Sequence, residues 1–260
     1  LPAIMDVDEA ARKEFFLAPP RTLARGDSAA AIAAAPHRLK GRVSNGGQEH
    51  FYLEGQVALA VPTEDGAVTL LSSTQDPSAV QHIVSRVLAV PSSHVTVETR
   101  RLGGGFGGKE TMATHFAALA ALVARKTGRP AKCRLDRDDD MIITGKRHEF
   151  FVDYDVGFDD EGMLLGVEFY ARCGNSLDQS VPVVNRALFH ADNCYYLPNV
   201  RFTGYPCKTH TVTAVAFRGF GSPQGMFAIE RGVDLVAWHL GLDPLEVRKR
   251  NFYRDGRDTT

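Results

Sequence analysis

The stretch GGGFGGKE, residues 103–110, lies between a strand-like run at residues 95–102 and a helical run at residues 111–126. A glycine-rich turn from a strand into a helix is typical of phosphate-binding sites, because backbone amides and the helix N-terminus face the anion there. The stretch matches the sequence patterns of two phosphate-binding motifs, but some of its residues do not suit the chemistry of either. It therefore indicates a different kind of cofactor.

The first pattern is the dinucleotide fingerprint G-x-G-x-x-G, which Gly103, Gly105 and Gly108 satisfy. The acidic residue that would contact the ribose, Asp136, comes later than the roughly 20 residues that are usual. Phe106 also places a ring where the pyrophosphate needs open backbone. A nicotinamide- or flavin-binding domain is therefore kept only as a distant alternative.

The second pattern is the nucleoside-triphosphate loop G-x-x-x-x-G-K-[ST], in which Glu110 replaces the hydroxyl residue that would hold magnesium. Glu110 also lies near an expected helix N-terminus, where its carboxylate would repel a bound phosphate. The sequence therefore excludes a nucleotide triphosphatase, because it lacks the hydroxyl that would bind magnesium. A loop that only turns a strand into a helix stays open as a structural alternative.

Composition narrows the class of protein. The 260 residues are 44% hydrophobic, which is ordinary for a globular core, and a net charge of -1 without a basic stripe argues against nucleic acid as a partner. No apolar run approaches the roughly 18 residues of a membrane span, and no secretory leader opens the sequence, so we expect a cytoplasmic protein without a membrane partner. The non-methionine start and the polar end predict a fragment of a longer protein.

Cysteine and histidine spacing argues against a metal held by the chain itself. The 4 cysteines form no C-x-x-C pair, and the 9 histidines include no H-E-x-x-H motif. Iron-sulfur clusters are therefore not expected on this chain, and any metal would arrive on a cofactor.

The hydrophobic pattern predicts an α+β fold, in which helices cover mixed and antiparallel sheets. Antiparallel hairpins are expected from residues 50–62 with 68–72, and from residues 149–158 with 163–173. Residues 1–39 are expected to be a largely extended connector, and residues 40–260 to form one domain.

Four helices are expected from their caps and apolar spacing. They begin near Pro77, Thr111, Ser222 and Pro244. The helical period predicts which residues of the first two helices face inward. In the helix from Pro77 they are Val80, Ile83, Val84, Val87 and Leu88. In the helix from Thr111 they are Phe116, Leu119, Ala120 and Val123.

Two further glycine corners, residues 46–51 and 217–225, resemble the first in placing phenylalanine among glycines. Glycines let backbone amides approach a ligand closely, and aromatic rings offer flat walls to a planar guest. Together the three corners predict a site for a phosphorylated, planar heteroaromatic group, although each taken singly is also explained as a turn.

Six motifs along the chain resemble the molybdenum-binding part of the xanthine dehydrogenase and xanthine oxidase family of molybdenum hydroxylases. The motifs are GGQEHFYLE (46–54), RLGGGFGGKE (101–110), TGRP (127–130), LDRDDDMIITGKRH (135–148), NRALFHADNCY (185–195) and AFRGFGSPQG (216–225). The resemblance implies that residues 40–260 form the first molybdenum-cofactor-binding domain, which is the N-terminal half of the cofactor site.

The resemblance also implies roles for individual residues. The cofactor, molybdopterin with its molybdenum, would be bound by Gln48, Phe106, Gly107, Phe217 and Arg218. Gln48 would hydrogen-bond an oxygen ligand of the metal, so that no protein group binds molybdenum directly. Glu110 and Arg186 would contact the substrate, and Phe220 would stack on it.

The implied activity is hydroxylation of purines, from hypoxanthine or xanthine to urate, with oxygen taken from water. Arg186 favours a purine, because the related aldehyde oxidases generally lack this arginine. The family's catalytic base lies in a later portion, so no catalytic residue is expected within these 260 residues, and the chain alone should be inactive. Iron-sulfur clusters and FAD would lie on other domains or subunits, beside the remaining molybdenum-binding domain.

Two alternatives stay open beside the purine hydroxylase. The protein could oxidise aldehydes or another N-heterocycle, or the chain could be an inactive fragment that holds no cofactor.

Overall fold

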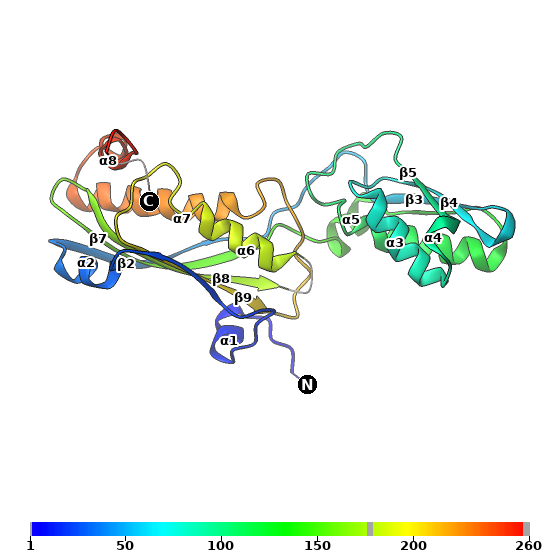
Figure 1. The fold of residues 1–260 in the computed structure, drawn as a ribbon, viewed down its shortest axis with the longest axis horizontal. Helices are drawn as coiled ribbons and strands as arrows, with labels where there is room; N and C mark the ends of the chain where they lie inside the picture. The colour runs from blue at the N-terminus through cyan, green and yellow to red at the C-terminus, as the bar shows by residue number, and fades with distance from the viewer. Residues whose placement is uncertain (1, 176–178, 257–260) are drawn as a thin grey trace. The chain divides into compact units, whose positions relative to one another are not determined.

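In the computed structural model, residues 2–175 and 179–256 are described, and the chain divides into two compact units. Unit 1 comprises Leu1–Gly47, His148–Thr211 and Gly219–Thr260, and unit 2 comprises Gln48–Arg147 and Val212–Arg218. Each unit contains a sheet with covering helices (Figure 1). The predicted α+β class with mixed and antiparallel sheets is confirmed.

Unit 1 is built on a five-stranded sheet in the order β1-β9-β8-β7-β2, in which β8 and β9 are parallel and the other neighbouring strands are antiparallel. Its strands are β1 (Arg21–Arg25), β2 (His37–Asn45), β7 (Phe150–Phe158), β8 (Leu164–Asn175) and β9 (Val200–Lys208). Its helices are α1 (Val7–Arg12), α2 (Ser28–Ala34), α6 (Ser180–Phe189), α7 (Ser222–Leu240) and α8 (Pro244–Asn251). The antiparallel pair of β7 and β8 confirms the second predicted hairpin.

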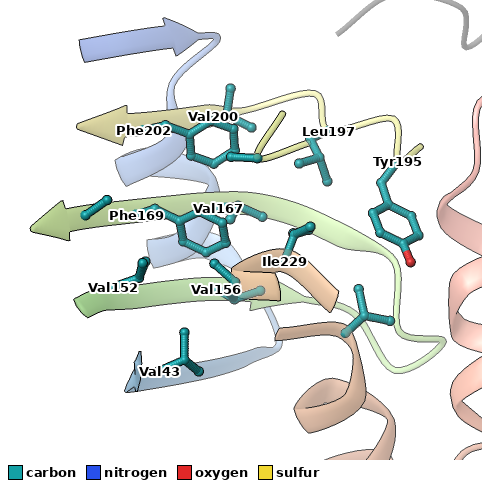
Figure 2. Packing of buried hydrophobic residues seen from close by; sticks show 14 of the residues in the cluster. Val43, Val152, Val156, Val167, Phe169, Tyr195, Leu197, Val200, Phe202 and Ile229 are labelled. Carbon is teal, nitrogen blue, oxygen red and sulfur yellow. The ribbon is translucent and has the colours of Figure 1, made fainter. Parts of the chain in front are cut away.

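Helices cover both faces of the unit 1 sheet. α6 and α7 pack on one face, and α1 and α2 lie on the other (Figure 1). The buried cluster beneath α6 and α7 includes Phe169 and Phe202, whose rings stack 5.0 Å apart, and Ile229 of α7 (Figure 2). Burial of such side chains contributes about 1.5–3 kcal/mol each, which anchors α7 on the sheet.

Unit 2 contains a four-stranded sheet in the order β5-β4-β3-β6. Its elements are β3 (Val57–Pro62), η1 (Glu64–Gly66), β4 (Val68–Ser72), α3 (Pro77–Leu88), η2 (Ser92–His94), β5 (Val95–Glu98), α4 (Ala113–Thr127), β6 (Ala131–Arg134) and α5 (Arg137–Ile143). The antiparallel pair of β3 and β4 confirms the first predicted hairpin. The helices expected near Pro77 and Thr111 are also confirmed, and each has a cap: Asp76 accepts from the amide of Ala79 at the start of α3, and Gly128 is left-handed at the end of α4.

The first strand of that hairpin is shorter than predicted, because residues 50–56 are not part of the sheet. Two of their side chains bond instead to α5 and to the glycine-rich stretch 103–110. Tyr52 Oη donates to Asp140 Oδ1 at 2.6 Å, and Glu54 Oε2 accepts from the amide of Gly103 at 2.9 Å. The alternating apolar pattern there does not form a ladder, and its members Phe51 and Leu53 are 68% and 92% exposed.

The inward faces of α3 and α4 agree with the prediction in part, since Val80, Val84, Phe116 and Ala120 are buried. Leu119 and Val123 are 54% and 51% exposed, and Val87 of α3 is 47% exposed. The α4 face that packs on the sheet and α3 is made largely of alanine: Ala117, Ala120, Ala121 and Ala124, with Phe116. Small side chains let the helix axes approach, so the close-packed face carries the smaller residues.

Residues 1–39 also differ from the expected extended connector. They contain α1, β1, α2 and the start of β2, and β1 pairs with β9 from Arg21↔Gly204 to Arg25↔Val200. Asp6 and Asp27 cap the two helices by accepting from amides in the first turn. This stretch is therefore part of unit 1, and β1 forms an edge of its sheet. No helix within the described residues is long and apolar enough to cross a membrane.

Candidate cofactor and substrate site

Three loop segments meet within unit 2, one from each predicted glycine corner. His50 Nε2 lies 2.7 Å from the carbonyl oxygen of Ala216, and the amide of Arg218 donates to the carbonyl of Phe106 at 2.9 Å. Gly107 has φ +96°, and a Cβ at this position would lie 2.5 Å from the carbonyl oxygen of Ala216. Only glycine therefore permits the observed contact between the loop and the segment of residues 216–218.

A buried arginine joins the members of this group. Arg147 is 8% exposed, its Nε donates to Gln48 Oε1 at 2.7 Å, and its Nη2 donates to the carbonyl of Arg218 at 3.0 Å. The guanidinium carbon lies 3.8 Å from the centre of the Phe217 ring, a cation–π contact. We call Gln48, His50, Phe106, Gly107, Arg147, Phe217 and Arg218 the unit 2 cluster.

Burial lowers the pKa of Arg147, although the guanidinium stays charged. Among the described residues, no carboxylate forms an ion pair with it, and its Nη1 is buried without a hydrogen-bond partner. A buried donor without an acceptor costs about 1–3 kcal/mol. Arg147 thus has hydrogen-bonding capacity that the described chain leaves unused.

His50 also packs against Phe217. The two rings stack with centroids 4.5 Å apart at 23°. Burial lowers the pKa of His50, and the hydrogen bond to the Ala216 carbonyl only partly offsets this. A neutral imidazole that donates through Nε2 satisfies this arrangement.

In the glycine loop, residues 103–110, some backbone amides are already hydrogen-bonded within the chain and are not available to a ligand. The amides of Gly107 and Lys109 both donate to Gln75 Oε1, at 2.9 and 3.2 Å. The Lys109 ammonium is fully buried and donates to the carbonyl of Glu54 at 2.6 Å and to Ser73 Oγ at 2.8 Å. Burial lowers the pKa of Lys109, and Glu54 opposes this. Its bonds hold the loop against the residues just before β3 and just after β4, which removes the phosphate-binding role of a nucleotide-loop lysine.

The acidic residue of the dinucleotide pattern also has a structural role. Asp136 is the N-cap of α5 and accepts from the amide of Asp139 at 2.8 Å. In the same helix, the fully buried Asp140 accepts from Tyr52 and from the amide of Gln56, each at 2.6 Å. These contacts explain both carboxylates without a ribose.

The predicted substrate residues lie in both units. Arg186, near the end of α6, and Phe220, just before α7, are brought together in unit 1, with the guanidinium carbon 5.6 Å from the ring centre. Gly221 and Gly225 make this possible, because a Cβ at either would collide with the backbone of α6. Glu110 lies in unit 2, half-buried on the loop that leads into α4.

Several members of the unit 2 cluster are accessible to a ligand. Gln48 and Arg218 are exposed, and the Phe106 ring is 46% exposed. Within the described residues, no group of three or more His, Cys, Asp or Glu side chains is arranged to hold a metal ion. The arrangement instead offers amide and guanidinium donors beside an aromatic ring.

Comparison with known proteins shows the family of this chain. A family model described as molybdopterin cofactor-binding domain matches residues 9–252. The chain belongs to the molybdopterin cofactor-binding domain family. It is 46% identical over 259 residues to xanthine dehydrogenase/oxidase of Felis catus, and 42% identical over 266 residues to nicotinate hydroxylase hnxS of Emericella nidulans. These alignments cover 98% and 100% of this chain, and the chain spans about 20% of each relative.

Solved structures agree with this assignment. The aldehyde oxidoreductase of Desulfovibrio gigas superposes with a TM-score of 0.88 at 27% identity, covering 100% of this chain and 30% of that one. Quinoline 2-oxidoreductase of Pseudomonas putida 86 has the same fold, with a TM-score of 0.84 at 24% identity, covering 100% of this chain and 35% of that one.

The chemical groups of the unit 2 cluster suit the molybdopterin cofactor that this domain family binds. The cofactor is planar and carries polar and anionic groups, and the cluster presents an exposed ring, an exposed guanidinium and a primary amide. The buried Nη1 of Arg147 needs an acceptor that the described chain does not supply. Because the amide of Gly107 is bonded to Gln75, that glycine serves the close approach to Ala216 rather than donation to the cofactor.

Sequence analysis missed Arg147, His50 and Gln75 as parts of the site. Arg147 and His50 lie inside two of the quoted motifs, LDRDDDMIITGKRH and GGQEHFYLE.

We expect unit 2 to lose stability at mildly acidic pH through His50. Its folded-state pKa lies below the ordinary 6.5, so the unfolded chain binds the proton first, and stability falls as pH drops from 6.5 towards the folded pKa. The midpoint of thermal unfolding should therefore fall between about pH 7.5 and about pH 5.5. His50→Gln keeps a donor for the Ala216 carbonyl without titrating there, and its midpoint should fall less. An equal fall in both proteins would contradict the prediction.

Proposed function

We propose that the protein carrying this chain hydroxylates purines at a molybdenum cofactor, with oxygen derived from water. The observation that carries the proposal is the meeting of Gln48, Phe106, Phe217 and Arg218 around Arg147 in a molybdopterin cofactor-binding domain. The similarity to xanthine dehydrogenase/oxidase over almost the whole chain supports the substrate class. Because the chain spans about 20% of those relatives, the activity belongs to the complete protein.

In this proposal the unit 2 cluster binds the cofactor, which supplies the two-electron oxidation when it is bound. Gln48 would hold the cofactor through a hydrogen bond from its side-chain amide, and no described residue of this chain would bind the metal directly. The exposed ring of Phe106 and the Arg218 guanidinium contact the cofactor. The Phe217 ring contacts both Arg147 and His50, and these contacts would hold the cluster together.

The substrate residues act on the charge that develops in the purine. Attack on an electron-poor ring carbon moves negative charge onto the ring carbonyl, and a guanidinium placed there stabilises the transition state more than the ground state. Arg186 is proposed for this role, with Phe220 stacked on the purine. Glu110 is proposed to orient the purine and exchange a proton with a ring nitrogen.

The complete protein is proposed to be cytoplasmic, and to use further domains or subunits with a second molybdenum-binding domain, the catalytic base, iron-sulfur clusters and FAD. An alternative substrate, an aldehyde or another N-heterocycle, is favoured by the relatives named nicotinate hydroxylase and aldehyde oxidoreductase. The nicotinamide-binding alternative loses its support, because Asp136 caps α5.

The test is metal analysis and xanthine turnover on the complete protein, compared with the isolated 260-residue chain. Molybdenum and urate formation in the complete protein, with neither in the isolated chain, are the expected results. A molybdenum-free complete protein that does not oxidise xanthine would contradict the proposal. Turnover of nicotinate or aldehydes without turnover of xanthine would keep the cofactor and replace the substrate.

A further inference from the structure

We propose that the face of the unit 2 sheet turned away from α3 and α4 is a docking surface for an acidic, aliphatic segment of the complete protein outside these 260 residues. This docking role goes beyond the cofactor and substrate roles. It rests on the proposed function only in that the complete protein has further domains.

The two faces of the unit 2 sheet have different surroundings. Ala58, Ala60 and Leu70 are fully buried in the cluster beneath α3 and α4. Because side chains alternate between the faces along a strand, the residues next to these point to the other face. There Leu59 lies opposite Leu71 in the register, and both are only half-buried. We call the face that carries these two leucines the open face.

A hollow of about 320 Å³ lies on the open face. Its middle is apolar, since Leu59, Leu71 and Val57 line it side by side. The charged residues that line it are Glu54, Glu98, Arg100, Arg101 and Lys132. Among the described residues that line the hollow there is no aromatic side chain, so it offers no platform on which a nucleic-acid base could stack. Aliphatic side chains suit this floor.

Both carboxylates of the hollow are already paired within the chain. Glu98 Oε2 accepts from Arg100 Nε at 3.3 Å, and Glu54 Oε2 lies 3.2 Å from Lys109 Nζ. Glu54 Oε2 also accepts from Ser73 Oγ at 2.5 Å. Neither carboxylate therefore needs a cation from a partner.

Three cations of the open face have no such partner. Arg101 and Lys132 line the hollow, and Arg134 lies opposite Val57 in the register. All three are exposed, and among the described residues none of them forms an ion pair or a side-chain hydrogen bond. The open face thus has unpaired positive charge around an apolar floor. Acidic side chains beside aliphatic ones complement both features.

The size of the relatives and the place of the hollow indicate where the segment comes from. The chain spans about 20% of each curated relative, so most of a protein of that length lies in other segments. The hollow also adjoins the glycine loop, because Glu54 accepts from the amide of Gly103 and Arg101 comes two residues before it. A further domain is proposed to complete the cofactor site, so we expect the covering segment to belong to the same protein.

The test is photochemical cross-linking in the complete protein. Thr96 is exposed on the open face, opposite Thr69, so Thr96→p-benzoylphenylalanine keeps the leucine floor and every charge. Under light this side chain joins covalently to C–H bonds that it touches, and mass spectrometry of the adduct identifies the segment. We expect an adduct with a segment outside these 260 residues that carries several Asp or Glu side chains beside aliphatic ones. The same probe at the exposed Val87 of α3 should not capture this segment.

Charge neutralisation tests the complementarity. In the photoreactive protein, Arg101→Gln, Lys132→Gln and Arg134→Gln together should lower the adduct yield by roughly 3-fold or more, because each exposed ion pair contributes modestly. The matched control neutralises three exposed cations near the ends of α3 and α4: Arg86→Gln, Lys126→Gln and Arg129→Gln. That control should keep the yield. The circular dichroism of both triple variants should match that of the parent, which separates lost docking from lost folding.

An adduct with residues 1–260 of the same or a second copy, with a separate protein, with nucleic acid or with a segment without acidic side chains would overturn the inference. Absence of any adduct would do the same, and equal yields in the two triple variants would overturn the choice of an acidic occupant. Cross-linking depends on neither molybdenum nor xanthine turnover. A complete protein that lacks both would overturn the proposed function, while the expected adduct would still support the docking surface.

Discussion

Arg186→Met in the complete protein should lower kcat/KM for xanthine by roughly 100–1000-fold and that for a simple aldehyde by less than about 10-fold. The reason is that Arg186 is proposed to stabilise charge on a purine carbonyl, and an aldehyde lacks this distant group. Its guanidinium lies over Phe220, and among the described residues it forms no ion pair that would explain it as a surface salt bridge. The measurement is steady-state kinetics with both substrates.

A second stacked arginine in unit 1 provides the control. The guanidinium of Arg231 lies 4.5 Å from the ring centre of Trp238 on α7. Arg231→Met removes a similar cation–π contact, worth about 0.5–1 kcal/mol at an exposed site, and should leave both kcat/KM values unchanged. Equal losses for xanthine and aldehyde in Arg186→Met would remove the argument for purine selectivity.

Much of the fold could be predicted from local signals in the sequence. Asp76-Pro77 and Gly128 mark a helix start and a helix end, because capping depends on neighbouring residues alone. The hairpins were predictable for the same reason, since a short turn sets which strands pair.

What the sequence did not reveal depends on contacts between distant residues. β1 pairs with β9 across most of the chain, so nothing near Arg21 signals a strand. α4 shows the same limit, because helical period marks an apolar face but does not tell which of Leu119 or Ala120 faces the sheet. Ala120, the smaller residue, packs against the sheet and α3.

The residues of the candidate site were likewise predicted only in part. Phe106, Phe217 and Arg218 were predicted from glycine corners and motif resemblance, and the structure joins their segments in unit 2. Arg147 was missed because its partners lie 99 and 71 residues away, at Gln48 and Arg218. A single arginine in a polar loop carries no local sign that it will be buried without a carboxylate.

Gly107→Ala should abolish molybdenum binding in the complete protein. Position 107 has φ +96°, a conformation that costs a non-glycine residue about 1–3 kcal/mol. The added methyl group would also lie 2.5 Å from the carbonyl oxygen of Ala216, and overpacking of this kind costs about 1–3 kcal/mol more. Relief of both strains requires the loop to move away from Ala216, which breaks the 2.9 Å hydrogen bond from the Arg218 amide to the Phe106 carbonyl.

Gly241→Ala separates this effect from backbone strain alone. Gly241 ends α7 with φ +67°, and a Cβ there meets nothing within 4 Å. This variant should lose about 1 kcal/mol of stability and keep its molybdenum, because no loop has to move. The measurements are molybdenum per protein by elemental analysis and the midpoint of thermal unfolding. Full molybdenum occupancy in Gly107→Ala would show that the cofactor does not depend on the contact between the glycine loop and the Ala216 segment, and Phe106 and Arg218 would then lose their proposed shared role.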